Sequence, residues 1–447
     1  MRKKFSTHDK YIFFCGQRQN RRTQKRGVGD GEMFELTEAD RAAVAALRAQ
    51  VPPGLLTAAY DTDFNLYRWL KAYNFHETDV PRRLIRHLKI RKLLELDDIA
   101  DKHRFDGRIF REYVPIGLLG PTGKDTRLVM IECAGRGDPE GLIKSVPGYQ
   151  FLMSRFQILN RALTQMNASE RETGVRSGLV YICDLEGLVM DPTLLPIVTG
   201  PVRMLWTLIG DNYPELITKL IVVNCTSFVH VLWRALSPFL PEHTRKKVII
   251  TGDNWREVLL KYVAEEHLPV HWGGTLRDAD GDQLCRSRIV VPKERKIPPE
   301  LYWRPPPDGP TPEQLPSITV PAGGRALVSH RLQQDGSFVH VRLYATEEYT
   351  FGIYFDDGKS KTNNNTIDAQ QKSETLDLET LYEYFPTVEL PGTSTMDHLR
   401  LPLEHNGVYH VKIGNEKAWF KSITVRCGLR FVDADDNDIA TETLQIT

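Results

Sequence analysis

Paired cysteines, long apolar runs and a surplus of charge are all missing from this chain of 447 residues. No Cys-x-x-Cys occurs, which excludes a zinc ribbon or a thioredoxin-like motif. No apolar stretch approaches the roughly 18 residues that a membrane-spanning helix needs. The chain has 58 Lys and Arg residues and 58 Asp and Glu residues, so it has no basic surplus. Binding of nucleic acid through the net charge of the whole protein is therefore not expected.

The composition that remains is that of an ordinary globular protein, with 41% hydrophobic and 26% charged residues. The length predicts two or three domains. Cys133, Cys183 and Cys225 lie in or beside apolar runs. We interpret them as buried free thiols of a reducing compartment.

The balance of charge hides a basic N-terminus. Residues 1–30 carry nine basic and two acidic residues, a surplus of +7, so the rest of the chain carries −7. We expect residues 1–33 to form a disordered tail outside the folded protein. A tether to anionic lipid stays open as the alternative, because each Lys or Arg near such a surface contributes roughly 1 kcal/mol.

Residues 34–107 are predicted to form a helical N-terminal lobe. Thr37 followed by Asp40 is typical of a capped helix start. Residues 79–95 place apolar side chains near one face of a helix and basic side chains elsewhere. We expect that basic face, which carries Arg82, Arg83, Arg86 and Lys89, to be a solvated surface.

Residues 108–276 have the pattern of an α/β unit. Four short, β-branched apolar runs are typical of strands buried on both faces of a parallel sheet. They lie at 127–132, 179–184, 220–225 and 247–251. The intervals leave room for helices, notably at 149–169 and 255–266.

Residues 277–315 are predicted to form a proline-rich linker, and residues 316–447 an all-β domain. Alternating apolar residues at 337–343, 408–413 and 423–427 favour a β-sandwich. The polar stretch 359–376 is predicted to be a mobile insertion.

Catalytic motifs nearly appear but fail on spacing. In 117–126 (GLLGPTGKDT) two required positions of a phosphate loop are wrong, and a Gly/Pro turn before a strand is the better interpretation. In 135–141 (GRGDPEG) the glycine spacing departs from the dinucleotide fingerprint. With no nucleophile elbow or metal motif either, we predict no catalytic residue, metal or cofactor, and therefore no enzyme.

Residues 227–239 form an unusual amphipathic segment. Positions 228, 231, 232, 235 and 239 make one helical stripe, Trp233 lies off it, and Pro238 ends the helix. A helix that is apolar on more than one side can cover a core, or can act as a movable lid over an apolar cavity and touch a membrane when it opens.

The order of several motifs resembles the CRAL-TRIO lipid-binding family over about residues 34–276. The motifs are FNLYRWLKAYNF at 64–75, Asp184-Leu185-Glu186-Gly187, Asn212-Tyr213-Pro214-Glu215, the 224–240 segment, Lys247-Val248-Ile249 and LPVHWGG at 268–274. The β-sandwich after the linker resembles a GOLD domain. A CRAL-TRIO unit followed by a GOLD domain is similar to the supernatant protein factor and tocopherol-associated protein group.

The resemblance implies an α/β bowl that holds one hydrophobic lipid under a gate helix, followed by the sandwich. It implies gate or lipid contacts by Phe228, Val231, Leu232, Leu236 and Phe239, and places Glu215 and Lys247 in the head-group set of the phosphatidylinositol-binding members. A structural ion pair stays the alternative for those two.

Two positions depart from the family pattern. Tyr73 stands where those members have an Arg, which removes a bidentate phosphate partner. Leu179 and Tyr181 replace the polar residues associated with choline-lipid binding.

We therefore predict a cytoplasmic protein, peripherally associated with membranes, that binds and transfers or presents a phospholipid, phosphoinositide, tocopherol or similar lipid. Its partners would be the lipid, transient membrane surfaces and a protein bound through the GOLD domain, with no nucleic acid. The alternatives are a lipid-sensing scaffold in signalling or membrane trafficking, and an NAD(P)-dependent enzyme that uses 135–141.

Overall fold

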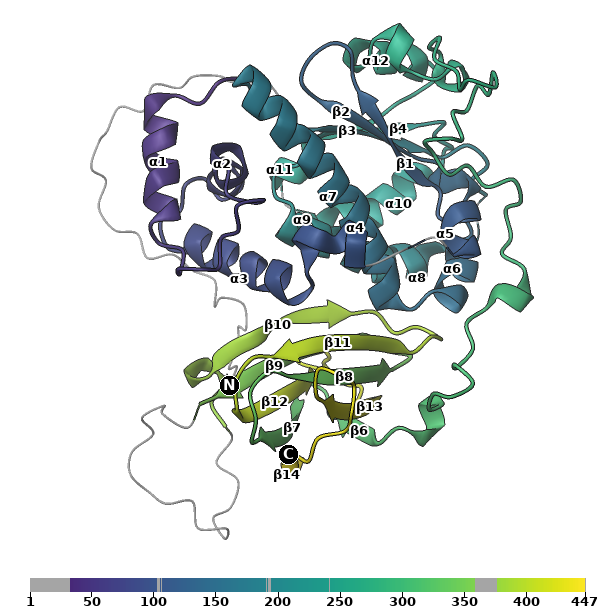
Figure 1. The fold of residues 1–447 in the computed structure, drawn as a ribbon. Helices are drawn as coiled ribbons and strands as arrows, with labels where there is room; N and C mark the ends of the chain where they lie inside the picture. Colours follow the sequence, from purple (N-terminus) through teal and green to yellow (C-terminus); the bar gives the residue numbers. More distant parts are fainter. Residues whose placement is uncertain are drawn as a thin grey trace, which may run out of the picture.

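The computed structural model describes residues 33–102, 105, 107–189, 191, 194–240, 242–357 and 376–446. The predicted basic tail, except for Met33, and nearly all of the predicted insertion at 359–376 lie outside these residues. Figure 1 shows the β-sandwich beneath the helical lobe and the α/β unit, with the linker running down one side.

The N-terminal lobe is helical, as predicted. Thr37 and Asp40 form the expected capping box at the start of the first helix, in which each side chain accepts from the other's backbone N–H. Apolar side chains of the lobe, led by Trp69 and Leu84, pack into the core shared with the α/β unit. Its helices are α1 (Glu38–Arg48), α2 (Asp63–Ala72), α3 (Asp79–Leu93), the 3-10 turn η1 (Leu96–Asp98) and α4 (Ile99–Lys102), and α5 (Arg108–Glu112) begins the α/β unit.

The central sheet contains the four predicted strands, and they are parallel, as predicted. Their order in space follows the chain from β2 to β5. The strands are β2 (Leu128–Glu132), β3 (Leu179–Asp184), β4 (Ile217–Val223) and β5 (Val248–Ile250).

A fifth strand, β1 (Ile116–Pro121), corrects the prediction of a simple turn at 117–126. It pairs antiparallel with β2 and makes the sheet mixed. Two glycines in this strand interrupt the apolar pattern by which a strand is recognised in the sequence. Gly120 has a φ of +127° at a bulge, and a Cβ on Gly117 would lie 2.2 Å from the carbonyl oxygen of Arg288. The pattern therefore suggests a turn although the backbone is extended.

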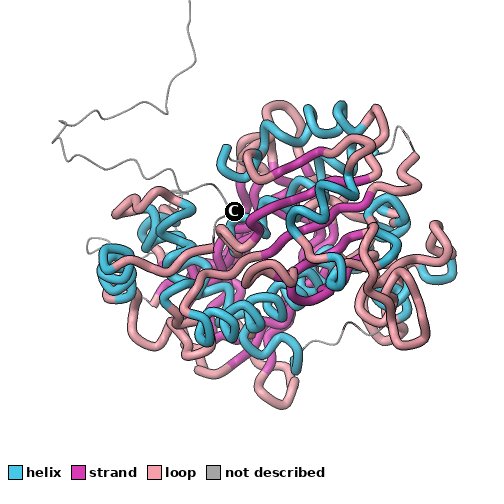
Figure 2. The backbone as a smooth tube through the Cα atoms, turned by 90° about the horizontal axis from the view of Figure 1, so that it is seen from above, coloured by secondary structure: helices cyan, strands magenta, loops and turns pink. Residues whose placement is uncertain are grey.

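The two faces of the sheet are covered differently. Val129 and Ile131 face α12 (Trp255–Tyr262) and the segment that carries Trp272, where packing is solid. The alternate residues Leu128 and Met130 face the long helix α7 (Gly148–Thr173). Figure 2 shows helices around the strands on both sides. Further helices and turns among the described residues of this unit are η2 (Ala134–Arg136), α6 (Pro139–Ser145), α8 (Leu194–Ile197), the π-helical turn η3 (Val198–Val202), α9 (Arg203–Asn212), α10 (Val229–Leu236), η4 (Ser237–Phe239), α11 (Glu242–Arg245), η5 (Glu265–His267) and η6 (Val270–Trp272).

The Asp184 motif fixes the end of the sheet. Its carboxylate accepts hydrogen bonds from Trp272 Nε1 at 3.0 Å, Asn224 Nδ2 at 2.7 Å and the Glu186 backbone N–H at 2.9 Å. One side chain thus joins three separate segments, and we assign it a structural role.

The C-terminal domain is a two-layer antiparallel β domain. One sheet has the order β10-β9-β12-β7-β14 and the other β11-β8-β13-β6. Val339, Val341 and Leu343 are buried, as the alternation predicted. The strands are β6 (Ser317–Val320), β7 (Arg325–Leu332), β8 (Ser337–Tyr344), β9 (Tyr349–Asp356), β10 (Tyr382–Leu390), β11 (Asp397–Leu403), β12 (Gly407–Gly414), β13 (Ile423–Val432) and β14 (Glu442–Ile446).

Helix α3 joins the lobe to the sandwich through Arg86 and Lys89, which corrects the prediction of a solvated surface for these two residues, whereas Arg82 is exposed as predicted. Arg86 Nη2 donates to the carbonyl oxygen of Thr387 at 2.5 Å, and Lys89 Nζ donates to that of Glu383 at 2.9 Å. Both acceptors lie on β10. Because these carbonyls need donors where β10 faces the lobe, basic side chains serve as interface contacts.

Candidate functional site

A cavity of about 610 Å³ lies between the sheet and α10. Its volume is in the range of roughly 300–1,000 Å³ that is usual for ligand pockets. Side chains of β2, β3, β4 and β5 form the floor, and α7, α9 and α10 supply walls. Apolar lining residues include Met130, Ile158, Trp206, Leu220, Val222 and Ile250.

Of the predicted gate residues, Val231, Leu232 and Leu236 lie on α10, whereas Phe228 precedes this helix and Phe239 lies in η4. Leu232 and Leu236 line the cavity together with Val229 and Trp233. Trp233, which lies off the predicted stripe, is therefore on the cavity side.

Two predicted gate residues of the described region, Phe228 and Val231, are not among those that line the cavity. Phe228 caps the N-terminus of α10, and Val231 is 47% exposed on the outer side. Phe239 ends η4, and its side chain lies outside the described residues.

Glu215 and Lys247, the predicted head-group pair, both line the cavity and form an ion pair of 2.5 Å. Arg176 and Lys71 approach the other carboxylate oxygen at 3.2 and 3.4 Å. Burial acts to raise the pKa of Glu215, but these cations, Lys247 first, lower it to about 2. The Glu215 backbone has a φ of +57°, a conformation that a non-glycine residue adopts only when its surroundings enforce it.

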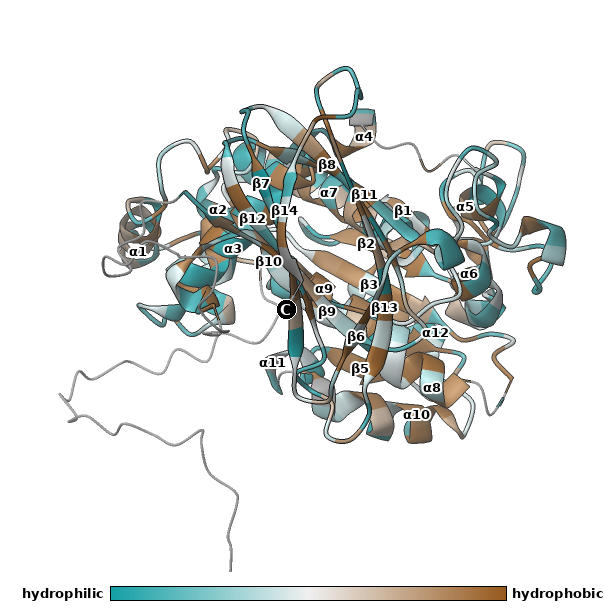
Figure 3. Cartoon of the chain, turned by 90° about the horizontal axis from the view of Figure 1, so that it is seen from below, coloured by the Kyte–Doolittle hydropathy of each residue, from teal (hydrophilic) through white to brown (hydrophobic). Residues whose placement is uncertain are grey.

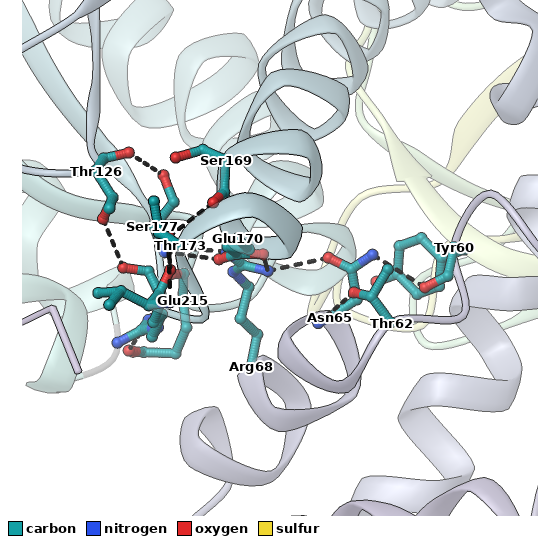
Figure 4. Close-up of polar contacts among 12 residues, drawn as sticks. Tyr60, Thr62, Asn65, Arg68, Thr126, Ser169, Glu170, Thr173, Ser177 and Glu215 are labelled. Atoms are coloured by element: carbon teal, nitrogen blue, oxygen red, sulfur yellow. Dashed lines mark hydrogen bonds and ion pairs between the residues drawn. The ribbon is translucent and has the colours of Figure 1, made fainter. Parts of the chain in front are cut away.

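A second buried pair extends this cluster away from the cavity. Arg68 on α2 contacts Glu170, near the end of α7, with both guanidinium Nη atoms, and Glu170 also accepts from the backbone N–H of Ser177 at 2.7 Å. Figure 4 shows Arg68 between Glu170 and Asn65, with Glu215 close by. We call the set Arg68, Lys71, Glu170, Arg176, Glu215 and Lys247 the basic cluster.

The basic cluster has more positive than negative groups. Its four cations exceed its two carboxylates by two charges. Arg176 Nε and Nη1 are buried without a hydrogen-bond partner. Buried donors of this kind are costly, so the cluster favours an additional anionic or acceptor group.

A polar triad lies on the cavity wall, among otherwise apolar side chains. Arg155 on α7 donates to Glu132 Oε1 at 2.6 Å, and the Tyr181 hydroxyl donates to Glu132 Oε2. Arg155 is 5% exposed, and its Nε has no partner. Burial and the Glu132 carboxylate raise the pKa of Tyr181 well above its usual range, so the phenol stays a neutral donor.

Sequence reasoning missed Arg68, Glu132, Arg155, Glu170 and Arg176. One signal was available for Arg155. It shares a helical stripe with Leu159, Ala162 and Met166, all of which are buried, and a charge in such a stripe indicates a buried pair. The others meet their partners only through tertiary structure, across 23 residues of sequence for Glu132 and Arg155, 39 for Arg176 and Glu215, and 102 for Arg68 and Glu170.

The cysteines of the described region are free thiols: Cys133, Cys183, Cys225, Cys285 and Cys427. Cys183 lines the cavity, and burial raises its pKa well above its usual range. A protonated thiol is a weak nucleophile, so Cys183 contributes polarisable apolar surface there.

Comparison with known proteins identifies the family. The CRAL/TRIO domain model matches residues 111–274, and a model described as "F28H7_8_C:-like, C-terminal domain" matches residues 301–440. The CRAL-TRIO domain-containing protein F28H7.8 of Caenorhabditis elegans is 33% identical over 397 residues, which are 88% of this chain and 90% of that protein. The chain belongs to the CRAL-TRIO family.

Other similar proteins cover different shares of the chain. Protein ctg-1 of Caenorhabditis elegans is 22% identical over 83% of this chain and 92% of its own length. Patellin-4 of Arabidopsis thaliana is 27% identical over 52% of this chain and 42% of its own length. The crystal structure of Sfh5 matches 58% of this chain and 94% of its own, at 18% identity and a TM-score of 0.44.

The family model that matches residues 301–440 is not described as a GOLD domain, so the assignment of the β domain to the GOLD type stays a prediction. Among the described residues, no helix combines the length and the apolar composition needed to cross a membrane.

Proposed function

We propose that this CRAL-TRIO protein binds one hydrophobic lipid in the cavity and transfers or presents it at membranes, without covalent chemistry. Members of the family typically bind or transfer lipids. The observation that carries the proposal is the apolar cavity of about 610 Å³ between the sheet and α10. The proposed domains are a helical lobe at 34–107, the lipid-binding domain at 108–276, a linker at 277–315 and a GOLD-type domain at 316–447.

The energy available from the apolar lining supports this role. Burying one CH₂ group contributes roughly 0.8 kcal/mol, so a sixteen-carbon chain contributes on the order of 10 kcal/mol before the costs of binding. Reactive residues are not needed to hold such a ligand.

The basic cluster supports a lipid with an anionic head group. Lys247 lies at the cavity wall, and Arg176 behind it has unused donors. A phosphate or phosphoinositol group entering beside Glu215 would meet a net positive environment. Tyr73 also lines the cavity, so the aromatic ring replaces the guanidinium that the resemblance leads one to expect.

The polar triad of Glu132, Arg155 and Tyr181 suggests a second property of the ligand, a neutral oxygen acceptor within the cavity. Arg155 and Glu132 neutralise each other, so a full charge is not required there. The unpaired Nε of Arg155 would instead be satisfied by an ester carbonyl or a hydroxyl oxygen.

A lipid-transfer assay tests whether the cavity carries a lipid between membranes. Leu220→Trp places a large ring into the cavity from β4, and we expect it to slow the transfer of fluorescent phosphatidylinositol between vesicles at least tenfold. Leu444→Ser, on an exposed site of the sandwich, is the matched control and should transfer as the wild type does. Equal transfer rates for Leu220→Trp and wild type would contradict the proposal.

A lipid-sensing scaffold in signalling or trafficking is the second candidate. The contacts of α3 and α9 with β10 favour it, because they connect the cavity walls to the sandwich, where a protein partner could read the ligand state. Unchanged signalling output from a transfer-deficient Leu220→Trp variant would argue against the cavity as the sensor.

A further inference from the structure

The loop 415–422, which joins β12 to β13, exposes two adjacent aromatic side chains. Trp419 is 85% exposed and Phe420 is 96% exposed. Phe420 therefore buries almost none of its ring against the protein. Such exposure of two large neighbouring rings on a well-formed domain indicates a surface that binds something else.

The base of this loop is fixed. The Asn415 side-chain amide donates to the carbonyl oxygens of Val320 at 3.3 Å, Pro321 at 3.2 Å and Lys421 at 2.8 Å. The Asn415 backbone N–H also donates to the carbonyl of Gly324 at 2.9 Å. Since both ends of the loop are held, the two rings project from a defined support.

The loop is joined to a wall of the cavity by a chain of charges. Lys417 pairs with Glu389 on β10, and Glu389 lies 3.5 Å from Arg203, the first residue of α9. Arg203 also contacts Glu348 at 2.9 Å. Because α9 contributes Trp206 to the lining, these ion pairs connect the loop to a wall of the cavity.

Exposed apolar residues also stand next in sequence to three residues that line the cavity, Leu188, Leu194 and Leu232. Val231 on α10 is 47% exposed, Leu195 on α8 is 45% exposed, and Val189 before α8 is 58% exposed. Both α8 and α10 pack against η3, which leads into α9. In Figure 3, α8 and α10 lie toward the lower edge of the view.

We propose that Trp419 and Phe420 insert into the interfacial layer of a phospholipid bilayer and so dock the cavity entrance on the membrane. The inference rests on the proposed function, since a lipid cargo must enter from a bilayer. Trp prefers the interface because one part of its ring is apolar while its N–H needs a polar partner. Two rings that protrude without a surrounding groove suit a soft lipid phase, whereas a protein would need a cleft shaped to receive both.

The charges around the loop identify the type of membrane contact. Lys417, Lys421 and Lys412 are each paired with a glutamate: Glu389, Glu347 and Glu416. No unpaired basic side chain flanks the two rings among the described residues of the loop. The contact should therefore depend on aromatic insertion, and zwitterionic lipid should suffice.

The test uses the full-length protein and vesicles of phosphatidylcholine alone, which exclude any contribution of the basic N-terminus to anionic lipid. We expect Trp419→Ser/Phe420→Ser to lower vesicle co-sedimentation at least tenfold. The control Leu444→Ser, also an exposed apolar residue of the sandwich, should stay within twofold of wild type. Brominated phosphatidylcholine should quench part of the tryptophan fluorescence of wild type, and Trp419→Phe should lose that part while it still binds.

Equal vesicle binding by the double variant would overturn the inference. A change from dimer to monomer in the double variant, with vesicle binding intact, would also overturn it and assign the rings to a second copy of the chain. Native mass spectrometry of the same samples separates this inference from the proposed function. The double variant should keep its cavity ligand, whereas failure of the proposed function would leave wild type empty while vesicle binding still depended on the two rings.

Discussion

At the scale of single residues, the buried charges decide what the cavity can hold. Glu215 is 8% exposed and holds Lys247, Arg176 and Lys71 together at the cavity wall. Removing one partner from such a group leaves uncompensated charge in a poorly solvated place, which is far more costly than the net gain from forming the pair.

Glu215→Gln should lower the free energy of unfolding at pH 7 by about 3–5 kcal/mol, because three cations lose their carboxylate. Urea unfolding measures this. The matched control is Glu242→Gln, which removes an exposed ion pair with Lys246 and should cause no measurable change. An equal stability of Glu215→Gln and wild type would contradict the assigned charge network.

The pH dependence of that difference follows from the pKa of Glu215, which is lowered to about 2 from an ordinary 4.5. A lowered carboxyl pKa contributes stability that is fully present above about pH 4.5 and is lost as the pH falls toward 2. The stability gap between wild type and Glu215→Gln should therefore be constant from pH 7 to 5 and close below pH 4.5. A gap that closes above pH 5 would contradict the low pKa.

At the scale of helices and strands, the start of α7 depends on a residue from the sandwich. Asp397 on β11 accepts a hydrogen bond from the Tyr149 backbone N–H at 2.7 Å. A carboxylate at a helix N-terminus satisfies free N–H groups. Burial nevertheless raises the pKa of Asp397 to about 6, and the Tyr149 hydrogen bond opposes that rise only in part.

Asp397→Asn should reveal this raised pKa. The folded state holds a proton on Asp397 up to about pH 6 while the unfolded state releases it near pH 3.8, so wild type should gain stability relative to Asp397→Asn as the pH falls from about 7 to 4. The gain is at most about 3 kcal/mol, at roughly 1.4 kcal/mol per unit. Urea unfolding of both proteins between pH 4 and 8 measures it, and parallel curves would contradict the raised pKa.

Substitutions of two neighbouring residues on the gate helix α10 should have different effects on lipid binding. Leu232 lines the cavity and Val231 faces outward. Leu232→Asp should lower lipid occupancy by at least tenfold in native mass spectra, because it places a charge in apolar lining. Val231→Asp should keep the ligand but slow vesicle-to-vesicle transfer. Equal effects of the two substitutions on occupancy would contradict the assigned orientation of α10.

The sequence predicted the elements better than their contacts. Apolar periodicity identified the four parallel strands, because burial on both faces leaves few polar residues in them. It missed β1, where glycines required by a bulge and by the approach of Arg288 remove the apolar pattern. It also placed Trp233 outside the main stripe of α10, because a helix beside a cavity can bury more than one stripe.

At the site, the motifs predicted Glu215 and Lys247 as a pair, and the structure brings them together. Arg68, Arg155 and Arg176 could not be predicted as a set. Each meets its carboxylate through tertiary packing, as Arg68 on α2 meets Glu170 across 102 residues of sequence. A charged residue has no local periodicity that indicates a distant partner.

At the scale of the whole molecule, the sandwich supports the lipid unit at several points. It contacts α3 through Arg86 and Lys89, the start of α7 through Asp397, and α9 through Glu389 and Arg203. All three helices contribute residues to the cavity lining. A membrane-bound sandwich would therefore hold the gate side of the cavity in a fixed position against the lipid surface.

The central claim is that the space under α10 takes up one lipid molecule. Native mass spectrometry of delipidated protein, after incubation with liposomes of mixed membrane lipids, tests it most directly. We predict a mass increase of one lipid per chain, which Leu220→Trp largely abolishes and Leu444→Ser leaves unchanged. A chain that keeps its bare mass after exposure to every lipid mixture would contradict the account.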